Sequence, residues 1–361
     1  MLPIKKKEEE AITTEPNSTN RKLENTVCTK RDKSSKGIII ISLDFELNWG
    51  VHDVFTLEQY EENLLGARIA IPKILDLFNQ FGIHATWATV GMLCFKNKKE
   101  LMENLPPLHP SYTNTNFSPY EKLDSIGENE EQDPLHFGLS LIQKIAECPK
   151  QEVASHTFSH FYCLEEGQTI EEFEADLKAS LYCGIINGLP IKSLVFPRNQ
   201  TNPRYLQVCK AYGIESFRGN ESSWMYKASK FNGDGSWKRL IRLSDCYLNI
   251  SGHNTYPLSE VVTEPIVNLP SSRFLRPYSK KLKSLELLRL RRIKKSIINA
   301  AKNGEVFHLW WHPHNFGKNI EENLQFLTEI LHLVEKLRNE YGFESLTMAE
   351  ASSLALQVKD R

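Results

Sequence analysis

The apolar and polar positions of this 361-residue chain follow two periods, and each period predicts one kind of element. Gly37–Gly50 (GIIIISLDFELNWG) contains a run of β-branched residues, which is typical of a strand buried on both faces, as in a parallel sheet or barrel. Apolar residues at helical spacing then predict a helix over 56–80, interrupted at Pro72. The segment 84–92 (HATWATVGM) predicts a second strand. A strand, a helix and a strand in this order indicate the start of a βαβ unit.

The same alternation continues along the rest of the chain. Strands are predicted at 152–155, 193–196, 214–217, 305–311 and 343–347, and helices at 135–148, 169–187, 203–212, 280–301 and 320–341. The helix over 169–187 opens with Thr169 three residues ahead of Glu172, which is the spacing of a capping box. No clear period runs through 219–285. The alternation predicts an α/β fold with a parallel, barrel-like sheet.

Three stretches differ from the barrel domain that we expect over 37–350. Residues 1–36 are polar and charged, so we expect a disordered tail that cannot bury enough surface to offset its ordering entropy. Residues 96–135 form a polar insertion rich in Pro and Asn, which is either a lid over a site or a disordered loop. Residues 351–361 are expected to form a C-terminal tail.

The composition narrows the class of protein. Apolar residues make up 40% and charged residues 25% of the chain, as in soluble globular proteins. The net charge of −1 gives no nucleic-acid footprint, so no nucleic-acid partner is expected. No apolar run has the length of a membrane span, and the N-terminus lacks the apolar core of a secretion signal, so membrane association is not indicated. Seven scattered cysteines without CxxC pairs argue against a disulfide framework or a thiolate zinc site and favour a cytoplasmic protein.

Two carboxylates follow the first predicted strand closely. Asp44 and Glu46 are two positions apart, and residues i and i+2 of a strand project to the same side. Both acids are therefore expected to enter one small space, where they repel each other unless a cation or a shared proton lies between them. The alternative is a strand that ends in solvent with two ordinary surface acids.

Two histidines follow the strand predicted at 152–155. His156 and His160 are four residues apart, and if the segment is helical, both imidazoles lie on one face and can share a metal. With Glu46 they would form a three-ligand site with an open position, as in catalytic metal centres. A divalent metal, with zinc as the default for this donor set, is therefore expected. Asp44 would remain beside the metal as a general base.

Two later strand ends carry further candidates. Arg198 follows the strand at 193–196 and can hold the base carboxylate ionised, or it can pair with an acid on the surface. His312 follows the strand at 305–311 and is a candidate general acid, with His314 two residues further on as the alternative. His308, inside the same strand, is interpreted as a core histidine.

Three tryptophans are candidates for an apolar wall against a sugar ring. Trp49, Trp310 and Trp311 all lie near predicted strand ends, and aromatic faces suit the C–H faces of sugars. The alternative is core packing, which we expect for one of Trp310 and Trp311.

The order of these motifs resembles that of the NodB-homology polysaccharide deacetylases, also called carbohydrate esterase family 4. The resemblance rests on the carboxylate pair, the ATWATVG strand, the SHTFSH segment and the late strand that ends in His312, and it covers roughly 37–350. It implies a distorted (β/α)7 barrel and metal-dependent removal of acetyl groups from N- or O-acetylated sugars. It implies Asp44 as base, His156 and His160 as metal ligands, and His312 as acid.

Three departures from the family pattern concern particular residues. The usual adjacent Asp-Asp pair is here a carboxylate-x-carboxylate pair, so Glu46 as ligand rests on strand geometry. The family's Arg-x-Pro-Tyr segment reads PRNQ, so Arg198 matches loosely and the oxyanion-binding amide is assigned to Asn199. The expected Asp-Trp segment reads ESFRGNESSW, which leaves Arg218 or Asp245 to tune the late histidine.

The sequence therefore predicts a deacetylase of an acetylated sugar or glycan precursor, with Trp49, Asn199, Trp311 and His314 as substrate-binding residues. One alternative is hydrolysis of another non-peptide C–N bond on the same fold. The other is a glycan-binding protein without catalysis.

Overall fold

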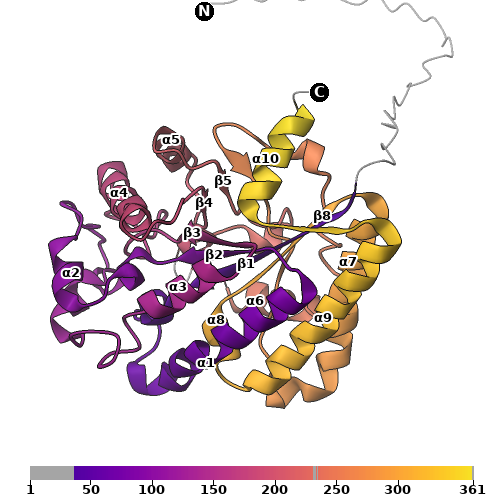
Figure 1. Cartoon of the computed structure of the whole chain (residues 1–361), viewed down its shortest axis with the longest axis horizontal. Helices are drawn as coiled ribbons and strands as arrows, with labels where there is room; N and C mark the ends of the chain where they lie inside the picture. Colours follow the sequence, from indigo (N-terminus) through magenta and orange to yellow (C-terminus); the bar gives the residue numbers. More distant parts are fainter. Residues whose placement is uncertain (1–35, 231–232, 234, 360–361) are drawn as a thin grey trace, which may run out of the picture. The chain divides into compact units, whose positions relative to one another are not determined.

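A computed structural model describes residues 36–359 of the chain, except 231, 232 and 234. The predicted disordered tail over 1–36 lies outside the described residues, apart from Lys36. The centre of the described part is a nine-stranded parallel sheet with helices packed around it (Figure 1).

Eight strands of the sheet follow one another in the order β6-β5-β4-β3-β2-β1-β8-β7, and β9 pairs with the first residues of β1. All of these pairings are parallel. The strands are β1 (Ile38–Phe45), β2 (Ala85–Thr89), β3 (Gln151–Ser155), β4 (Ser193–Leu194), β5 (Ser216–Phe217), β6 (Val267–Asn268), β7 (Arg273–Phe274), β8 (Val306–Trp311) and β9 (Glu344–Leu346).

Strand β1 is buried on both faces, as its isoleucine run predicts. Ile39 and Ile41 pack in the large core between the sheet and its outer helices, whereas Ile38 and Ile40 pack in a separate cluster with residues of α10. Because side chains alternate along a strand, the face of Ile38 and Ile40 is also the face of Asp44, two residues beyond Ser42. The strand thus carries an apolar layer at its start and a carboxylate at its end.

One short segment joins the two edges of the sheet. Leu269 N–H donates to Phe217 O at 2.9 Å, on the β5 side, and Ser272 N–H donates to His308 O at 2.8 Å, on the β8 side. The sheet therefore curls into a half-barrel whose edges β6 and β7 follow each other in the chain, separated by four residues that include Pro270.

The helices surround this sheet. They are α1 (Leu57–Phe81), α2 (Lys98–Glu103), α3 (Leu139–Glu147), α4 (Ile170–Ile186), α5 (Pro203–Ala211), α6 (Ser236–Asp245), α7 (Glu286–Asn303), α8 (Pro313–Phe316), α9 (Ile320–Tyr341) and α10 (Met348–Lys359). Helices α1, α9 and α7 pack side by side along one face of the sheet (Figure 1). Within the described part of the chain, no helix combines the length and the apolar character that crossing a membrane requires.

Three differences from the predicted elements concern the continuity or the order of a whole segment. Helix α1 runs through Pro72 without a break, and its buried face continues on both sides of that residue. The insertion over 96–135 contains α2 and buries Phe117 and Leu123, so it is ordered where one alternative had it disordered. The segment set apart as a C-terminal tail is helical to Lys359, because α10 buries apolar residues against the start of β1.

Candidate metal centre

Asp44 and Glu46 converge at the end of β1, as the i, i+2 spacing predicts. Asp44 belongs to β1 and Glu46 follows it, and both side chains are buried. The Nε2 atom of His312 lies 3.7 Å from Asp44 Oδ2 and 3.6 Å from Glu46 Oε1, so one imidazole reaches both acids.

The segment that carries His156 and His160 is a turn and not a helix. Thr157 and His160 have φ values of 62° and 58°, which a right-handed helix does not contain. The turn is held by Asp176 of α4, whose carboxylate accepts the N–H groups of Phe158 at 2.7 Å and Ser159 at 3.0 Å. The helical geometry considered from the sequence is therefore wrong, although the two imidazoles still come together.

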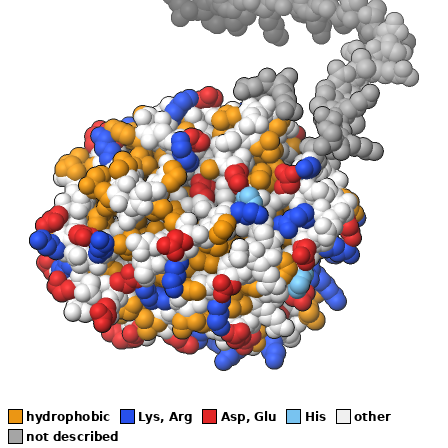
Figure 2. Space-filling model, in the orientation of Figure 1, with side chains coloured by type: hydrophobic (Ala, Val, Ile, Leu, Met, Phe, Trp, Pro, Cys, Tyr) orange, Lys and Arg blue, Asp and Glu red, His pale blue; other side chains and the backbone are white. Residues whose placement is uncertain are grey.

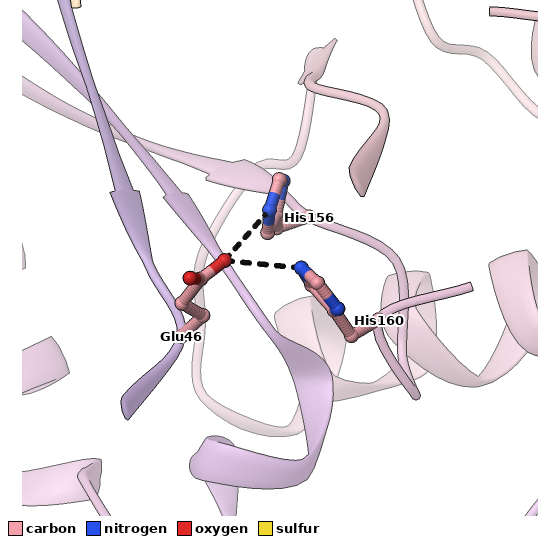
Figure 3. A group of neighbouring side chains, drawn as sticks. All are labelled: Glu46, His156 and His160. Carbon is pink, nitrogen blue, oxygen red and sulfur yellow. Dashed lines mark hydrogen bonds and ion pairs between the residues drawn. The ribbon is translucent and has the colours of Figure 1, made fainter. Parts of the chain in front are cut away.

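Glu46, His156 and His160 form a compact buried group, in which the carboxylate points at both rings (Figure 3). Glu46 Oε2 lies 3.2 Å from His156 Nε2 and 3.0 Å from His160 Nε2. Burial on its own would raise the pKa of Glu46, but the imidazoles of His312 and His160 hold it well below its ordinary value.

The hydrogen bonds of both rings assign the free lone pairs to Nε2. His156 Nδ1 donates to the Val195 carbonyl at 2.8 Å, since a carbonyl only accepts. His160 Nδ1 donates to the Tyr162 hydroxyl at 3.1 Å, because that hydroxyl donates its own hydrogen to Asp53 at 3.2 Å. If both rings are neutral, two lone pairs and a carboxylate oxygen point at the same place, which is repulsive unless a cation lies there. The donor set fits a divalent metal.

Gly50 makes room for the Glu46 carboxylate. A Cβ atom built on Gly50 would lie 2.0 Å from Glu46 Cδ, well inside van der Waals contact. Any side chain at position 50 would therefore displace the carboxylate from the two histidines.

The sequence suggested that Arg198 could hold the carboxylate of Asp44, but Arg198 pairs with a different acid. It forms an ion pair with Asp53, and its guanidinium stacks 4.1 Å from the centre of the Tyr162 ring. The reason is the backbone after β4, where Arg198 and Asn199 both have positive φ, of 54° and 53°, and turn the side chain toward Asp53. Arg198 thus packs on the face of the Tyr162 ring, and the hydroxyl of that ring is the hydrogen-bond partner of His160.

Arg218 is the cation that holds Asp44. Its two Nη atoms each lie 2.7 Å from one carboxylate oxygen, and the side chain is fully buried. Burial alone would raise the pKa of Asp44, but the guanidinium of Arg218 and the imidazole of His156 hold it below its ordinary value. The sequence offered one signal for this role, since Arg218 directly follows the strand predicted at 214–217.

Asn199 supports Arg218, and its backbone N–H is already paired within the turn. Asn199 Oδ1 accepts a hydrogen bond from Arg218 Nη2 at 2.9 Å. Its backbone N–H, assigned to an oxyanion from the sequence, donates instead to Phe196 O at 2.9 Å within the turn.

His312 and His314 both lie near the Glu46–His156–His160 group, but their surroundings differ. His314 is 4% exposed, its Nε2 lies 3.9 Å from Glu46 Oε1, and burial lowers its pKa to about 3. The side chain of His312 is 24% exposed. Asn315 Nδ2 donates to His312 Nδ1 at 3.2 Å, and Tyr60 donates to Asn315 Oδ1 at 3.3 Å, an orientation that leaves the His312 hydrogen on Nε2, facing the acids.

The tryptophans are arranged differently from the predicted sugar wall. Trp49 and Trp311 are fully buried, and Trp49 donates to His136 O at 2.9 Å, so neither can face a substrate. Trp310 instead lines a cavity beside His312. The remaining alternative, core packing for one of Trp310 and Trp311, holds for Trp311. Asp245, the other candidate to tune His312, pairs with Arg273.

No family model matches the chain, and neither does any curated protein. Solved structures match its fold. A protein from Mycobacterium smegmatis described as a polysaccharide deacetylase aligns with a TM-score of 0.53 and 12% identity over 90% of this chain and 91% of that chain. A second, from Pseudomonas aeruginosa PAO1, gives a TM-score of 0.53 and 10% identity over 88% and 90%. The 4-alpha-glucanotransferase of Thermococcus litoralis gives 0.50 and 13%, over 88% of this chain and 40% of that chain.

These likenesses confirm the predicted fold class. The curled parallel sheet with its surrounding helices matches the distorted (β/α)7 barrel of the NodB-type deacetylases. At such low identities the likeness concerns the fold, and the chemistry has to be argued from the side chains at the ends of the strands.

Proposed function

We propose that this protein is a metal-dependent deacetylase that removes the acetyl group from an N-acetylated or O-acetylated sugar in a glycan or glycan precursor. The observation that carries the proposal is the buried Glu46–His156–His160 group with Asp44 beside it, on a fold shared with polysaccharide deacetylases. Zinc suits two imidazoles and one carboxylate. A divalent ion held by these residues would polarise the acyl carbonyl and lower the pKa of a water molecule.

Asp44 is the proposed general base. Its ion pair with Arg218 keeps it ionised at neutral pH and fixes its orientation toward the metal group. The same pair makes Asp44 a weak base, which is sufficient when the water that it deprotonates is itself acidified.

His312 is the proposed general acid. Its Nε2 faces the two carboxylates, it borders the cavity, and its Nδ1 is held by Asn315, so a proton on Nε2 is directed at the reacting group. Donation of that proton to the departing amine or alcohol would complete the hydrolysis. The more buried His314 is the alternative acid.

The proposed roles of the other residues follow from their contacts. Arg198 and Asn199 position His160 and Arg218, and Trp310 contributes the aromatic surface beside the sugar. We also propose a cytoplasmic location and, with it, a precursor rather than a finished wall polymer as substrate.

The test is metal content together with acetate release, compared among wild type, His156→Ala and Asp44→Asn on N-acetylated sugars. We expect one metal per chain and acetate release in wild type, loss of metal in His156→Ala, and metal without turnover in Asp44→Asn. His332→Ala, an exposed histidine far along α9, serves as the matched control and should behave as wild type.

Three results would redirect the proposal. Wild type without any divalent metal would overturn the metal site. Release of ammonia or formate in place of acetate would identify a hydrolase of another C–N bond. Stoichiometric metal and tight sugar binding without turnover would identify a glycan-binding protein.

A further inference from the structure

A large cavity lies directly beside the proposed reaction centre. Its volume is about 810 Å³, within the range of ligand sites, and His312, Trp310 and Asn199 form part of its wall. A substrate whose acetyl group reaches His312 would therefore place its neighbouring groups in this cavity.

The wall of the cavity is strongly cationic. Among the residues that the structure describes, the wall contains seven arginine and lysine side chains and a single carboxylate, that of Glu221. Glu221 is buried, and burial raises the pKa of its carboxyl group, which weakens even this one negative charge. Over the face of the molecule drawn in Figure 2, lysine and arginine are interspersed with aspartate and glutamate. The whole chain has a net charge of −1, so the positive charge is a local property of the cavity.

Some of these cations are already neutralised and others are not. Arg273 pairs with Asp245 at 2.8 Å, and Lys230 pairs with Glu166 at 2.7 Å. By contrast, Lys227, Arg239 and Arg276 form no ion pair with any other residue that the structure describes. Three positive charges without an acidic partner among the described residues, around one cavity, favour a ligand with at least two negative charges. Arginine forks suit the oxygens of phosphate in particular.

We propose that this cavity binds a phosphate or diphosphate group joined to the acetylated sugar, so that the substrate is a phosphate-linked amino sugar. This inference rests on the proposed function and names the substrate class of the same site. The carrier beyond the phosphate can be a nucleoside or a lipid, because both present the same anionic group. A lipid carrier is one of the two candidates because Trp237 and Leu240 of α6 are exposed apolar side chains, and Leu240 lies in the cavity wall.

The first measurement is the binding of inorganic phosphate to the metal-loaded protein by calorimetry at low ionic strength. We compare wild type with Arg239→Gln/Arg276→Gln and with a matched control, Arg204→Gln/Arg291→Gln. The control removes two exposed arginines that lie outside the cavity wall. We expect the cavity variant to bind phosphate at least about tenfold more weakly, the size expected when charge-assisted hydrogen bonds are lost, and the control to bind as wild type. Equal affinity in both double variants, or no binding in wild type, would overturn the inference.

The second measurement is acetate release from an N-acetylated sugar 1-phosphate and from the methyl glycoside of the same sugar. We expect a higher kcat/KM for the phosphate in wild type, and a ratio reduced about tenfold or more in Arg239→Gln/Arg276→Gln. Nucleoside-diphosphate-linked and polyprenyl-phosphate-linked forms of that sugar then identify the carrier, and preference for either supports the shared phosphate chemistry. Equal kcat/KM for phosphate and methyl glycoside in all variants would overturn the inference.

The two measurements separate the inference from the proposed function. Acetate release without phosphate binding leaves the deacetylase in place and removes the phosphate site. Phosphate binding that depends on Arg239 and Arg276, without acetate release from any of these sugars, keeps the site and removes the deacetylase.

Discussion

The two halves of the sheet hold their strands by different means. Strands β1, β2, β3 and β8 have five to eight residues each and are paired along most of their length, whereas β4, β5, β6 and β7 have two residues each. The long strands are held by backbone ladders and apolar burial. The short ones depend on specific polar contacts, such as Asp245, which accepts the N–H groups of Ile250 at 2.9 Å and Ser251 at 2.8 Å and pairs with Arg273.

The candidate chemistry is divided along the same line. Glu46, His156 and His312 follow long strands. The cationic cavity wall comes from the segments that connect the short strands, with Arg239 on α6 and Arg276 just after β7. Under the two proposals above, the half with the long strands (the regular half) would carry the reaction, and the half with the short strands (the irregular half) would recognise what is attached to the reacting group.

The halves meet in one buried polar layer beneath Asp44. Ser42 of β1 contacts His308 of β8 at 2.8 Å and accepts from Arg218 at 3.0 Å, while His308 Nδ1 donates to Leu269 O at 3.2 Å. Arg218 follows β5, so Asp44 of the regular half is held by a residue of the irregular half.

The largest expected effect comes from breaking this link with Arg218→Met. The change leaves the buried Asp44 carboxylate without its partner, and removing one member of a buried ion pair typically costs about 3–5 kcal/mol. We expect a loss of this size in the free energy of unfolding, measured with urea. The double variant Asp44→Asn/Arg218→Met is the control, since neither position of the former ion pair is charged, and it should recover much of the loss. Equal losses in the single and double variants would contradict the assignment.

Gly50→Ala tests the regular half alone. The new Cβ would meet the Glu46 carboxylate, which is the flexible end of a side chain and can move away. We therefore expect little change in stability but a loss of zinc affinity on the order of a hundredfold, measured by competition with a chelator. Gly235→Ala, in the irregular half, is the matched control, because a Cβ there meets no atom within 4 Å. Unchanged zinc affinity in Gly50→Ala would show that Glu46 is not a ligand.

The regular half was largely predictable from the sequence because its signals are local. The isoleucine run of β1 is buried on both faces, the helix predicted over 320–341 has those bounds, and Thr169 and Glu172 form the predicted capping box. The convergence of the two acids also follows from period-two geometry.

The misassigned details depend on contacts between distant segments. The turn at His156–His160 is set by Asp176, which lies on the next helix, and no local pattern of the SHTFSH segment reports it. Arg198 and Arg218 both follow predicted strands, and the choice between them depends on the left-handed backbone at 198 and 199. The sequence leaves such a choice open because the polar residues of a turn favour several conformations.

A smaller loss of stability is expected when the pH is lowered, because His308 lies in the buried polar layer between the two halves. Burial lowers its pKa to about 3, whereas an unfolded histidine titrates near 6.5. Below about pH 6.5 the unfolded chain takes up a proton at this residue and the folded protein does not, so stability falls as the pH falls toward 3. At pH 5 the loss from this group is about 2 kcal/mol.

The check is the difference in unfolding free energy between pH 7 and pH 5, which removes the direct cost of each substitution. His308→Gln should reduce that difference by about 2 kcal/mol, whereas His332→Gln, an exposed histidine, should leave it near the wild-type value. Equal differences in the two variants would show that His308 does not stay neutral in the folded protein.

The smallest expected effect is a loss of zinc affinity when the residue that orients His160 is changed. Tyr162→Phe keeps the ring beside Arg198 but removes the acceptor of His160 Nδ1, so His160 loses the contact that directs its Nε2 toward the metal group. We expect zinc affinity to fall about tenfold, or about 1.4 kcal/mol, at the lower end of what such supporting contacts contribute. Tyr226→Phe makes the same change in the irregular half, where the hydroxyl donates to Asp245 at 2.8 Å, and should leave zinc affinity unchanged. If both variants bind zinc as wild type does, the orientation of His160 depends on its backbone turn and not on Tyr162.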